Sequence, residues 1–316
     1  MSPHQMLRFT EPSEFAAAIL GSDIDLTLAG DGEFTGDIMN VELGSLTIRR
    51  VSENLPLILH STNAVGRVTF AFHTQPGQSV YRNGIEVPSD AIVQVGNPQS
   101  IFQRSTGPMN WGSVSLPLEQ CLGARQFRSG ISVIPRQVDQ IISPPPGTLV
   151  NLRRLHAAVG MLATQAPEVT RSPVAARGLE ETMRAALAEC LDTIDIVEPT
   201  LSQRRHQAIM QRFHTILRRN TNRPLYVLEI AKAVGASLRS LTECCHEHLG
   251  MSPKKYMSLR NMHMVRRDLL AAHPTTTTVT DVATRYGFWQ FGRFAGHYRA
   301  LFGETPSSTL RRPRGN

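Results

Sequence analysis

Four residues whose side chains can contact nucleic acid bases follow Ser237 at the spacing of one helix face. They lie two, five, six and nine positions after this serine: Arg239, Thr242, Glu243 and His246. Ser237 is a favourable N-cap, so the sequence predicts that a helix begins directly after it. In a major groove, arginine binds guanine, glutamate accepts from cytosine N4 and threonine contacts a thymine methyl group. The alternative is an ordinary solvated helix face.

A second helix is expected in the stretch GFWQFGRFAGHYRALFGETP, residues 287–306. Phe288, Phe294, Tyr298 and Phe302 form its inward stripe, because aromatic residues at helical spacing usually belong to a core. The open face of this helix carries Gln290, Gly292, Arg293, Gly296 and His297. Arginines that follow are candidates for contacts with phosphate groups, with a solvated surface as the alternative: Arg299, Arg311 and Arg312.

The charge of the chain is divided unevenly along its 316 residues. Residues 204–316 hold 19 of the 33 basic residues and 6 of the 26 acidic ones, which leaves 14 basic and 20 acidic residues in 1–203. This asymmetry predicts a basic module that binds a polyanion, joined to a module that does not.

Elements in the first half are predicted to be mostly strands. Residues 24–118 alternate short β-branched or apolar runs with Gly, Asn, Pro and Asp, which is typical of an all-β barrel or sandwich. We therefore expect an α+β protein whose N-terminal part is such a barrel or sandwich. Aromatic residues that could line a ligand cavity of this part, with plain core as the alternative, are Phe70, Phe72, Tyr81, Phe102 and Trp111.

Neither a metal nor another cofactor is expected. His60 and His73 lie in the β-rich part, but no His-x-His pair with a following Glu accompanies them. The four cysteines, Cys121, Cys190, Cys244 and Cys245, lack the spacing of a metal site and are predicted to be reduced core thiols. No signal peptide and no run of eighteen apolar residues is found, so we expect a cytoplasmic protein that does not contact a membrane.

Helical periodicity begins after the proline-rich segment 141–148. Helices are predicted near 148–164, 175–195 and 202–219, and a fourth over 252–273 has a length of roughly 30 Å. The apolar positions of the first helix face either the same chain or a second copy. These positions are Leu149, Leu152, Leu155, Val159 and Leu162.

Two segments on either side of the 252–273 helix have the same pattern. In each, a short helix that contains a small residue (Ala231, Ala283) leads to a glycine (Gly235, Gly287) and then to a second helix. The small alanines allow close helix packing and the glycines allow the tight turn. Each segment is therefore predicted to be a helix-turn-helix unit, over about 226–249 and 278–302.

Residues 204–312 resemble the DNA-binding domain of the AraC/XylS family of bacterial transcription regulators. The matching pieces appear in the family's order: Ile230-Ala231, Gly235 with Ser237 and Leu241, Leu249-Gly250 with Ser252-Pro253, Val265-Arg266 with Leu269-Leu270, Val282-Ala283, Tyr286-Gly287-Phe288, and Phe302-Gly303 with Thr305-Pro306. The last helix is especially similar to the branch that contains the ethanolamine-operon activator. Two positions depart from the pattern: Cys245 replaces a phenylalanine, and Asn261 replaces an arginine.

The resemblance implies an effector-responsive activator of transcription that binds double-stranded DNA. Its two recognition helices would enter successive major grooves, with Gly292, Arg293 and Gly296 on the contacting face of the second. A small molecule in a cupin-like β-barrel sensor domain, 1–147, would change how that domain or a helical dimerisation region, 148–203, holds the DNA-binding domain, 204–316. The expected partners are a second copy of the chain and RNA polymerase.

Two other classes of protein remain open at this stage. One is a repressor or architectural DNA-binding protein that needs no effector. The other is a β-barrel enzyme joined to a DNA-binding module, although the sequence shows no nucleophile elbow, phosphate loop or metal triad.

Overall fold

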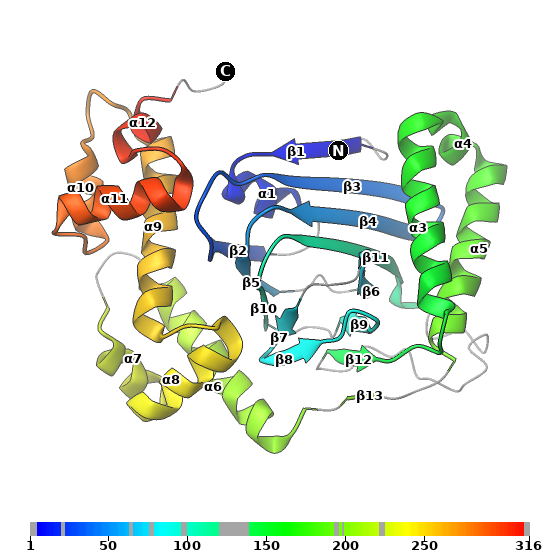
Figure 1. Cartoon of the computed structure of the whole chain (residues 1–316), viewed down its shortest axis with the longest axis horizontal. Helices are drawn as coiled ribbons and strands as arrows, with labels where there is room; N and C mark the ends of the chain where they lie inside the picture. Colours follow the sequence, from blue (N-terminus) through cyan, green and yellow to red (C-terminus); the bar gives the residue numbers. More distant parts are fainter. Residues whose placement is uncertain are drawn as a thin grey trace.

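A computed structural model describes residues 5–19, 23–62, 66–75, 79–95, 100–119, 139–192, 196–197, 199–220 and 225–312. The strands lie between two groups of helices, α3 to α5 on one side and α6 to α12 on the other (Figure 1). The predicted α+β class, with a β-rich N-terminal part and an all-helical C-terminal part, is confirmed. Cys121 lies outside the described residues.

The described strands form two antiparallel sheets that do not close into a barrel. The larger sheet has the order β1 (Gln5–Phe9), β3 (Gly36–Leu43), β4 (Leu46–Glu53), β11 (Met109–Pro117), β6 (Arg67–His73), β9 (Ile92–Val95), β12 (Gln140–Ile142), β13 (Ile196–Val197). The smaller has the order β2 (Asp23–Leu28), β5 (Leu57–Thr62), β10 (Ser100–Ser105), β7 (Val80–Arg82), β8 (Ile85–Val87).

The two faces of the larger sheet differ in chemistry because side chains alternate along each strand. On β6, Val68, Phe70 and Phe72 are fully buried on the outer face, where they join an apolar core with the helices that cover it. The alternate residues Arg67 and Thr69 belong to the inner face, which lines a cavity between the sheets. The outer face therefore anchors the sheet, and the inner face is left for polar groups.

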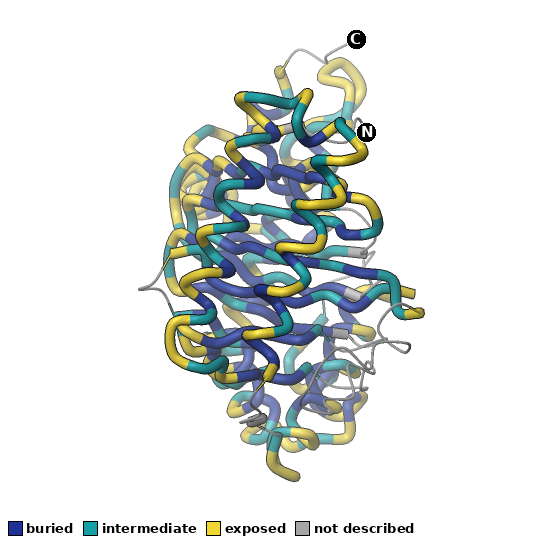
Figure 2. Tube along the Cα trace, turned by 90° about the vertical axis from the view of Figure 1, so that its right-hand side faces the viewer, coloured by how far each residue is buried: buried dark blue, intermediate teal, exposed yellow. Residues whose placement is uncertain are grey.

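Three helices cover this outer face: α3 (Thr148–Gln165), α4 (Pro167–Arg171) and α5 (Pro173–Cys190). Leu149, Leu152 and Val159 are buried in the same core as the sheet, and Leu155 packs against it. Figure 2, which views the molecule from this side, shows exposed residues on the outward surfaces of the helices and buried strands behind them. Packing within one chain, one of the two alternatives left by the sequence, accounts for this apolar face.

The C-terminal part is built around one central helix, α9 (Pro253–Ala271), about 28 Å long at 1.5 Å per residue. Before it lie α6 (Leu201–Arg219), α7 (Val227–Val234) and α8 (Leu238–Leu249). After it lie α10 (Val279–Arg285), α11 (Phe291–Phe302) and α12 (Pro306–Leu310). Figure 1 shows α7 and α8 at one end of α9 and α10 to α12 at the other.

The N-terminal and C-terminal parts share an apolar core. Phe15 of helix α1 (Pro12–Ala18) and Leu28 of β2 belong to one cluster with Val265 and Leu269 of α9 and Phe302 of α11. A second cluster joins Ile58 and Phe102 of the smaller sheet to α6 and α8. The helical part therefore packs directly on the β-rich part.

No helix among the described residues is long and apolar enough to cross a membrane.

Replacing Leu152 with alanine is expected to lower the free energy of unfolding by about 2–5 kcal/mol, because a fully buried leucine leaves a cavity. The control is Met161→Ala on the exposed side of the same helix, which should change it by less than about 0.5 kcal/mol. Urea unfolding of both variants measures the difference. Equal costs would contradict the packing of α3 on the sheet.

Candidate nucleic-acid interface

The first helix-turn-helix unit consists of α7 and α8. Gly235 ends α7 in the left-handed conformation, with φ of 70°, which an L side chain rarely adopts. The hydroxyl of Ser237 then accepts from the backbone N–H of Ser240 at 3.0 Å and caps α8. Leu241 and Leu249 bury the inner side of this helix. The predicted turn at Gly235 and the cap at Ser237 thus set the direction of α8 relative to α7.

The outward face of α8 holds the polar residues that the sequence singles out. Arg239, Glu243 and His246 are exposed and Thr242 is half-buried. The Arg239 Nε donates to Glu243 Oε1 at 2.9 Å, one helical turn away. A base edge that binds either residue must therefore compete with an exposed ion pair, which is a weak competitor.

The second unit consists of α10 and α11. Thr278 and Asp281 cap α10 reciprocally, and Gly287, with φ of 84°, makes the turn after Tyr286. Phe294, Tyr298 and Phe302 are buried as predicted, while Phe288 is half-buried. The Tyr298 hydroxyl donates to Thr309 Oγ1 at 2.9 Å, which ties α11 to α12.

The outward face of α11 holds two glycines and carries few charged side chains. All five predicted residues of this face are exposed: Gln290, Gly292, Arg293, Gly296 and His297. A Cβ at either glycine would meet nothing within 4 Å, so packing within the chain does not require glycine there. Because glycine has no side chain, another molecule can approach the backbone closely at both positions.

Two exposed aromatic residues beside this face were missed from the sequence. Trp289, two residues before α11, is 68% exposed. Phe291, the first residue of α11, is 41% exposed. Both fall outside the inward aromatic stripe, and that position is the signal that distinguishes them from the core residues. Their rings add exposed apolar surface at the N-terminal end of α11.

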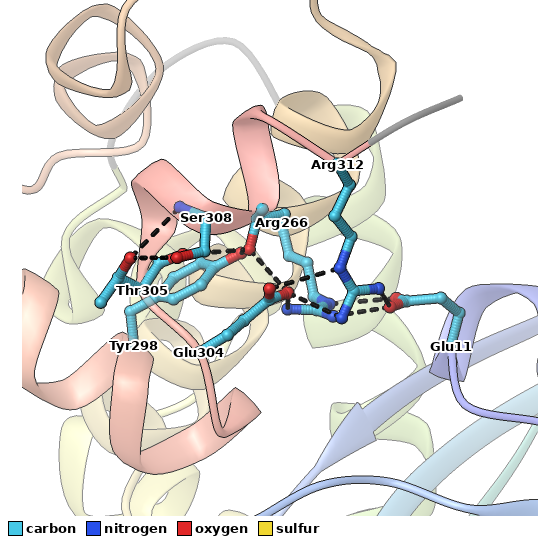
Figure 3. A network of polar contacts seen from close by, with 8 residues as sticks. Glu11, Arg266, Tyr298, Glu304, Thr305, Ser308 and Arg312 are labelled. Carbon is cyan, nitrogen blue, oxygen red and sulfur yellow. Dashed lines mark hydrogen bonds and ion pairs between the residues drawn. The ribbon is translucent and has the colours of Figure 1, made fainter. Parts of the chain in front are cut away.

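All three predicted phosphate contacts, Arg299, Arg311 and Arg312, are exposed. The third, Arg312, takes part in a network with the N-terminal part (Figure 3). It binds Glu11 Oε1 at 2.7 Å and Glu304 Oε1 at 3.0 Å. Arg266 of α9 binds the same two carboxylates, at 2.6 and 2.9 Å. Phosphate must therefore compete with two acidic side chains for Arg312.

A second group of polar contacts joins the two parts near the middle of α9. Asp25 of β2 contacts His214 Nε2 at 3.3 Å and Arg260 Nε at 3.5 Å. Burial alone would raise the pKa of Asp25, but the bond to His214 and the charge of Arg260 outweigh it and lower the pKa. The backbone N–H of Leu28 donates to His263 Nε2 at 2.9 Å.

The two departures from the family pattern have structural explanations. Cys245 is fully buried, with its sulfur 4.0 Å from that of Met210 in α6. The side-chain amide of Asn261 donates to the carbonyl oxygen of Tyr286 at 3.1 Å and so supports the turn of the second unit. Both residues thus stabilise the helical domain itself.

The residues predicted for an effector pocket separate in the structure. Trp111 lines a cavity of about 350 Å³ between the two sheets. Phe70 and Phe72 face away from it toward α3 and α5, and Phe102 packs against α6 and α8. The ring of Tyr81 is covered by the guanidinium of Arg104, 3.8 Å away. None of these four aromatic residues lines the cavity that Trp111 lines.

His60 and His73 are not brought together either. His60 of the smaller sheet stacks on His214, with ring centroids 3.4 Å apart. His73 of the larger sheet stacks on Trp111 at 4.5 Å. Among the described residues there is no group of three or more side chains suited to hold a metal ion.

Residues 230–312 match the family model of a helix-turn-helix domain. The probable thc operon regulatory protein of Rhodococcus erythropolis is 41% identical over 95 residues, which are 30% of this chain and 29% of that protein. XylDLEGF operon transcriptional activator 1 of Pseudomonas putida is 36% identical over 102 residues, 32% of this chain and 31% of that protein. Residues 230–312 form an AraC-type helix-turn-helix domain.

The similarity to these two relatives covers less than a third of either one. The AraC-like transcriptional activator CuxR aligns over 88% of this chain and 98% of its own, with 12% identity and a TM-score of 0.45. A probable AraC family regulator from Rhodopseudomonas palustris aligns over 34% of this chain and 98% of its own, with 31% identity and a TM-score of 0.31.

Acid is expected to weaken the contact between the AraC-type domain and β2. Burial lowers the pKa of His263 to about 4, below its ordinary value of 6.5. As the pH falls from 6.5 to 4, the unfolded chain takes up a proton that the folded chain resists, so the free energy of unfolding falls. His263→Gln, which retains an acceptor for Leu28, should reduce that slope by up to about 1.4 kcal/mol per pH unit.

Chemical unfolding at a series of pH values measures this slope. His273→Gln, at an exposed position beyond the end of α9, is the matched control and should leave the slope unchanged. Identical slopes for wild type and His263→Gln would show that His263 does not carry the expected proton linkage.

Proposed function

We propose that this protein is a sequence-specific DNA-binding transcription regulator. The observation that carries the proposal is the polar outward face of α8 on an AraC-type helix-turn-helix domain. The donors of Arg239 and the acceptors of Glu243 match groups that base edges present in the major groove, and Thr242 can contact a thymine methyl group. The balance of 19 basic against 6 acidic residues over 204–316 supports binding to a polyanion.

The arrangement of the two units supports binding to two successive major grooves. Helix α9 is about 28 Å long and holds one unit at each end, and one turn of duplex DNA advances about 34 Å. In this proposal α8 reads bases through side chains. Helix α11, with Gly292 and Gly296 on its face, approaches the duplex more closely and contributes mainly Arg293.

The β-rich part is proposed to sense a small molecule in the cavity between its sheets. Ile19, at the end of α1, and Ile24 of β2 line that cavity. Glu11, at the start of α1, and Asp25, the residue after Ile24, contact α9. A ligand that moves these elements changes their contacts with the DNA-binding domain. We also propose that the protein acts in the cytoplasm, as an activator that contacts RNA polymerase.

The division of the chain into a sensor domain, 1–147, a dimerisation region, 148–203, and a DNA-binding domain, 204–316, belongs to the same proposal. Since the inner faces of α3 and α5 are used within the chain, a homodimer would use their outer faces. Val150, Met161 and Val174 supply exposed apolar surface there.

Replacing Arg239 with alanine is expected to relax the choice of base at one or two positions of the DNA site. The expected cost is about 1–3 kcal/mol at each of those positions, with little effect elsewhere, because a base contact carries sequence information and a phosphate contact does not. Selection from random DNA followed by sequencing measures the preference of each variant.

Arg177→Ala, at an exposed arginine on α5 far from this face, is the control and should give the wild-type motif. If Arg239→Ala also selected the wild-type motif, Arg239 would not be a base-reading residue. If the wild-type chain enriched no motif at all, the proposed function would be wrong.

A further inference from the structure

The cavity between the sheets contains polar side chains of two kinds. Its arginines already have protein partners. Arg67 donates to the hydroxyls of Ser115 and Thr47, each at 3.0 Å, and to two backbone carbonyls. Arg82 binds Asp139 and Gln103, each at 2.8 Å. The third arginine of the lining, Arg49, donates to Asn40 Oδ1 at 2.7 Å, so each of the three is bonded to protein groups without a ligand.

Glu53 and Trp111 differ from the arginines. Glu53 is 7% exposed and Trp111 is 8% exposed, and both line the cavity. Among the described residues, Glu53 Oε2 and Trp111 Nε1 have no hydrogen-bond partner. Buried polar groups in folded proteins are nearly always satisfied, so two orphan groups that line one cavity indicate a missing partner there.

The strand register places these two groups near each other. On the adjacent strands β4 and β11, Glu53 lies opposite Met109 and Trp111 lies opposite Val51. Glu53 and Trp111 are therefore diagonal neighbours on one face, about 7–8 Å apart. The indole is held by stacking on His73, with ring planes 27° apart. The pair is preorganised to bind one small polar group.

Burial raises the pKa of Glu53 to about 8, so its carboxyl group is protonated at neutral pH. It then offers one O–H donor and one carbonyl acceptor, while Trp111 offers one N–H donor. The complementary group has a carbonyl oxygen that accepts and an N–H that donates. A carboxylate offers only acceptors, so it would leave the Glu53 carbonyl oxygen without a donor, and its charge would lose hydration on burial.

We propose that the cavity binds an uncharged small molecule that carries a primary amide, and that Glu53 and Trp111 select that amide. The amide oxygen accepts from Trp111 Nε1 and the amide nitrogen donates to the Glu53 carboxyl group. The apolar body of the molecule lies against Val51, Leu59 and Ile24, which also line the cavity. The volume of about 350 Å³ is in the range of small-molecule sites. This inference rests on the proposed sensing role and names the ligand class for it.

The test uses two probes of the same shape, 2-phenylacetamide and phenylacetate, titrated by calorimetry into the full chain at pH 7 without DNA. The amide should bind at least tenfold more tightly than the carboxylate. Glu53→Leu should weaken the amide at least tenfold, and Glu53→Gln, which keeps a donor and an acceptor, should restore binding to within about threefold of wild type.

Two further variants separate recognition from folding. Trp111→Phe keeps the ring and removes the N–H, and should also weaken the amide. Glu86→Gln is the control, because this exposed carboxylate is bonded to the Ser79 hydroxyl at 2.8 Å and does not line the cavity, and it should leave both probes unaffected.

Any of three results would overturn the inference. Phenylacetate could bind more tightly than the amide, Glu53→Leu could bind both probes as tightly as wild type does, or the amide could fail to bind at millimolar concentration. Because the titration contains no DNA, these outcomes do not depend on whether the protein binds DNA. A chain that selects a DNA motif yet ignores the amide would retain the proposed function and lose only this ligand class.

Discussion

A buried ion pair between Arg266 and Glu11 joins the two halves of the molecule. Arg266 lies on α9, the helix to which both helix-turn-helix units attach, and Glu11 precedes α1 of the β-rich part. Both side chains are more than nine-tenths buried, and two hydrogen bonds of 2.6 and 3.0 Å join them. Loss of one partner would leave the other charge buried and uncompensated, which typically costs about 3–5 kcal/mol. The pair therefore favours one orientation of α9 over its alternatives.

The same pair connects the DNA-binding surface to the cavity. Arg312 shares Glu11 with Arg266, so an arginine suited to bind phosphate is held by the N-terminal part (Figure 3). Helix α1 follows Glu11 directly, and Phe15 on that helix lines the cavity. Only three residues thus separate Glu11, which contacts α9, from Phe15, which lines the cavity. In the proposed function, this short segment is the physical link between ligand binding and DNA binding.

The helical domain could be predicted from the sequence because its signals are local. Ser237 caps α8, Gly235 and Gly287 make the turns, and the aromatic stripe of α11 identifies its buried side. Each of these features acts within a few residues of its own position. Trp289 was not predicted as an exposed residue of this surface. Its position outside the buried aromatic stripe nevertheless distinguishes it from the core aromatic residues.

The β-rich part was predicted only in outline because its decisive contacts are distant in sequence. Alternation along β6 shows that Phe70 and Phe72 share a face, but it does not show whether that face meets the helices or the second sheet. Both faces of this sheet are covered, one by α3 and α5 and the other by the smaller sheet. The Arg266–Glu11 pair spans 255 residues and has no local signal. The orphan groups of Glu53 and Trp111 likewise appear only once the strands are paired.

Hydroxyl-radical footprinting of the full chain on a selected DNA site tests most directly whether α8 and α11 enter successive major grooves. We expect, for each bound chain, two protected patches about one helical turn apart on the same side of the duplex. A single patch per chain, or protection that continues around the duplex, would contradict it.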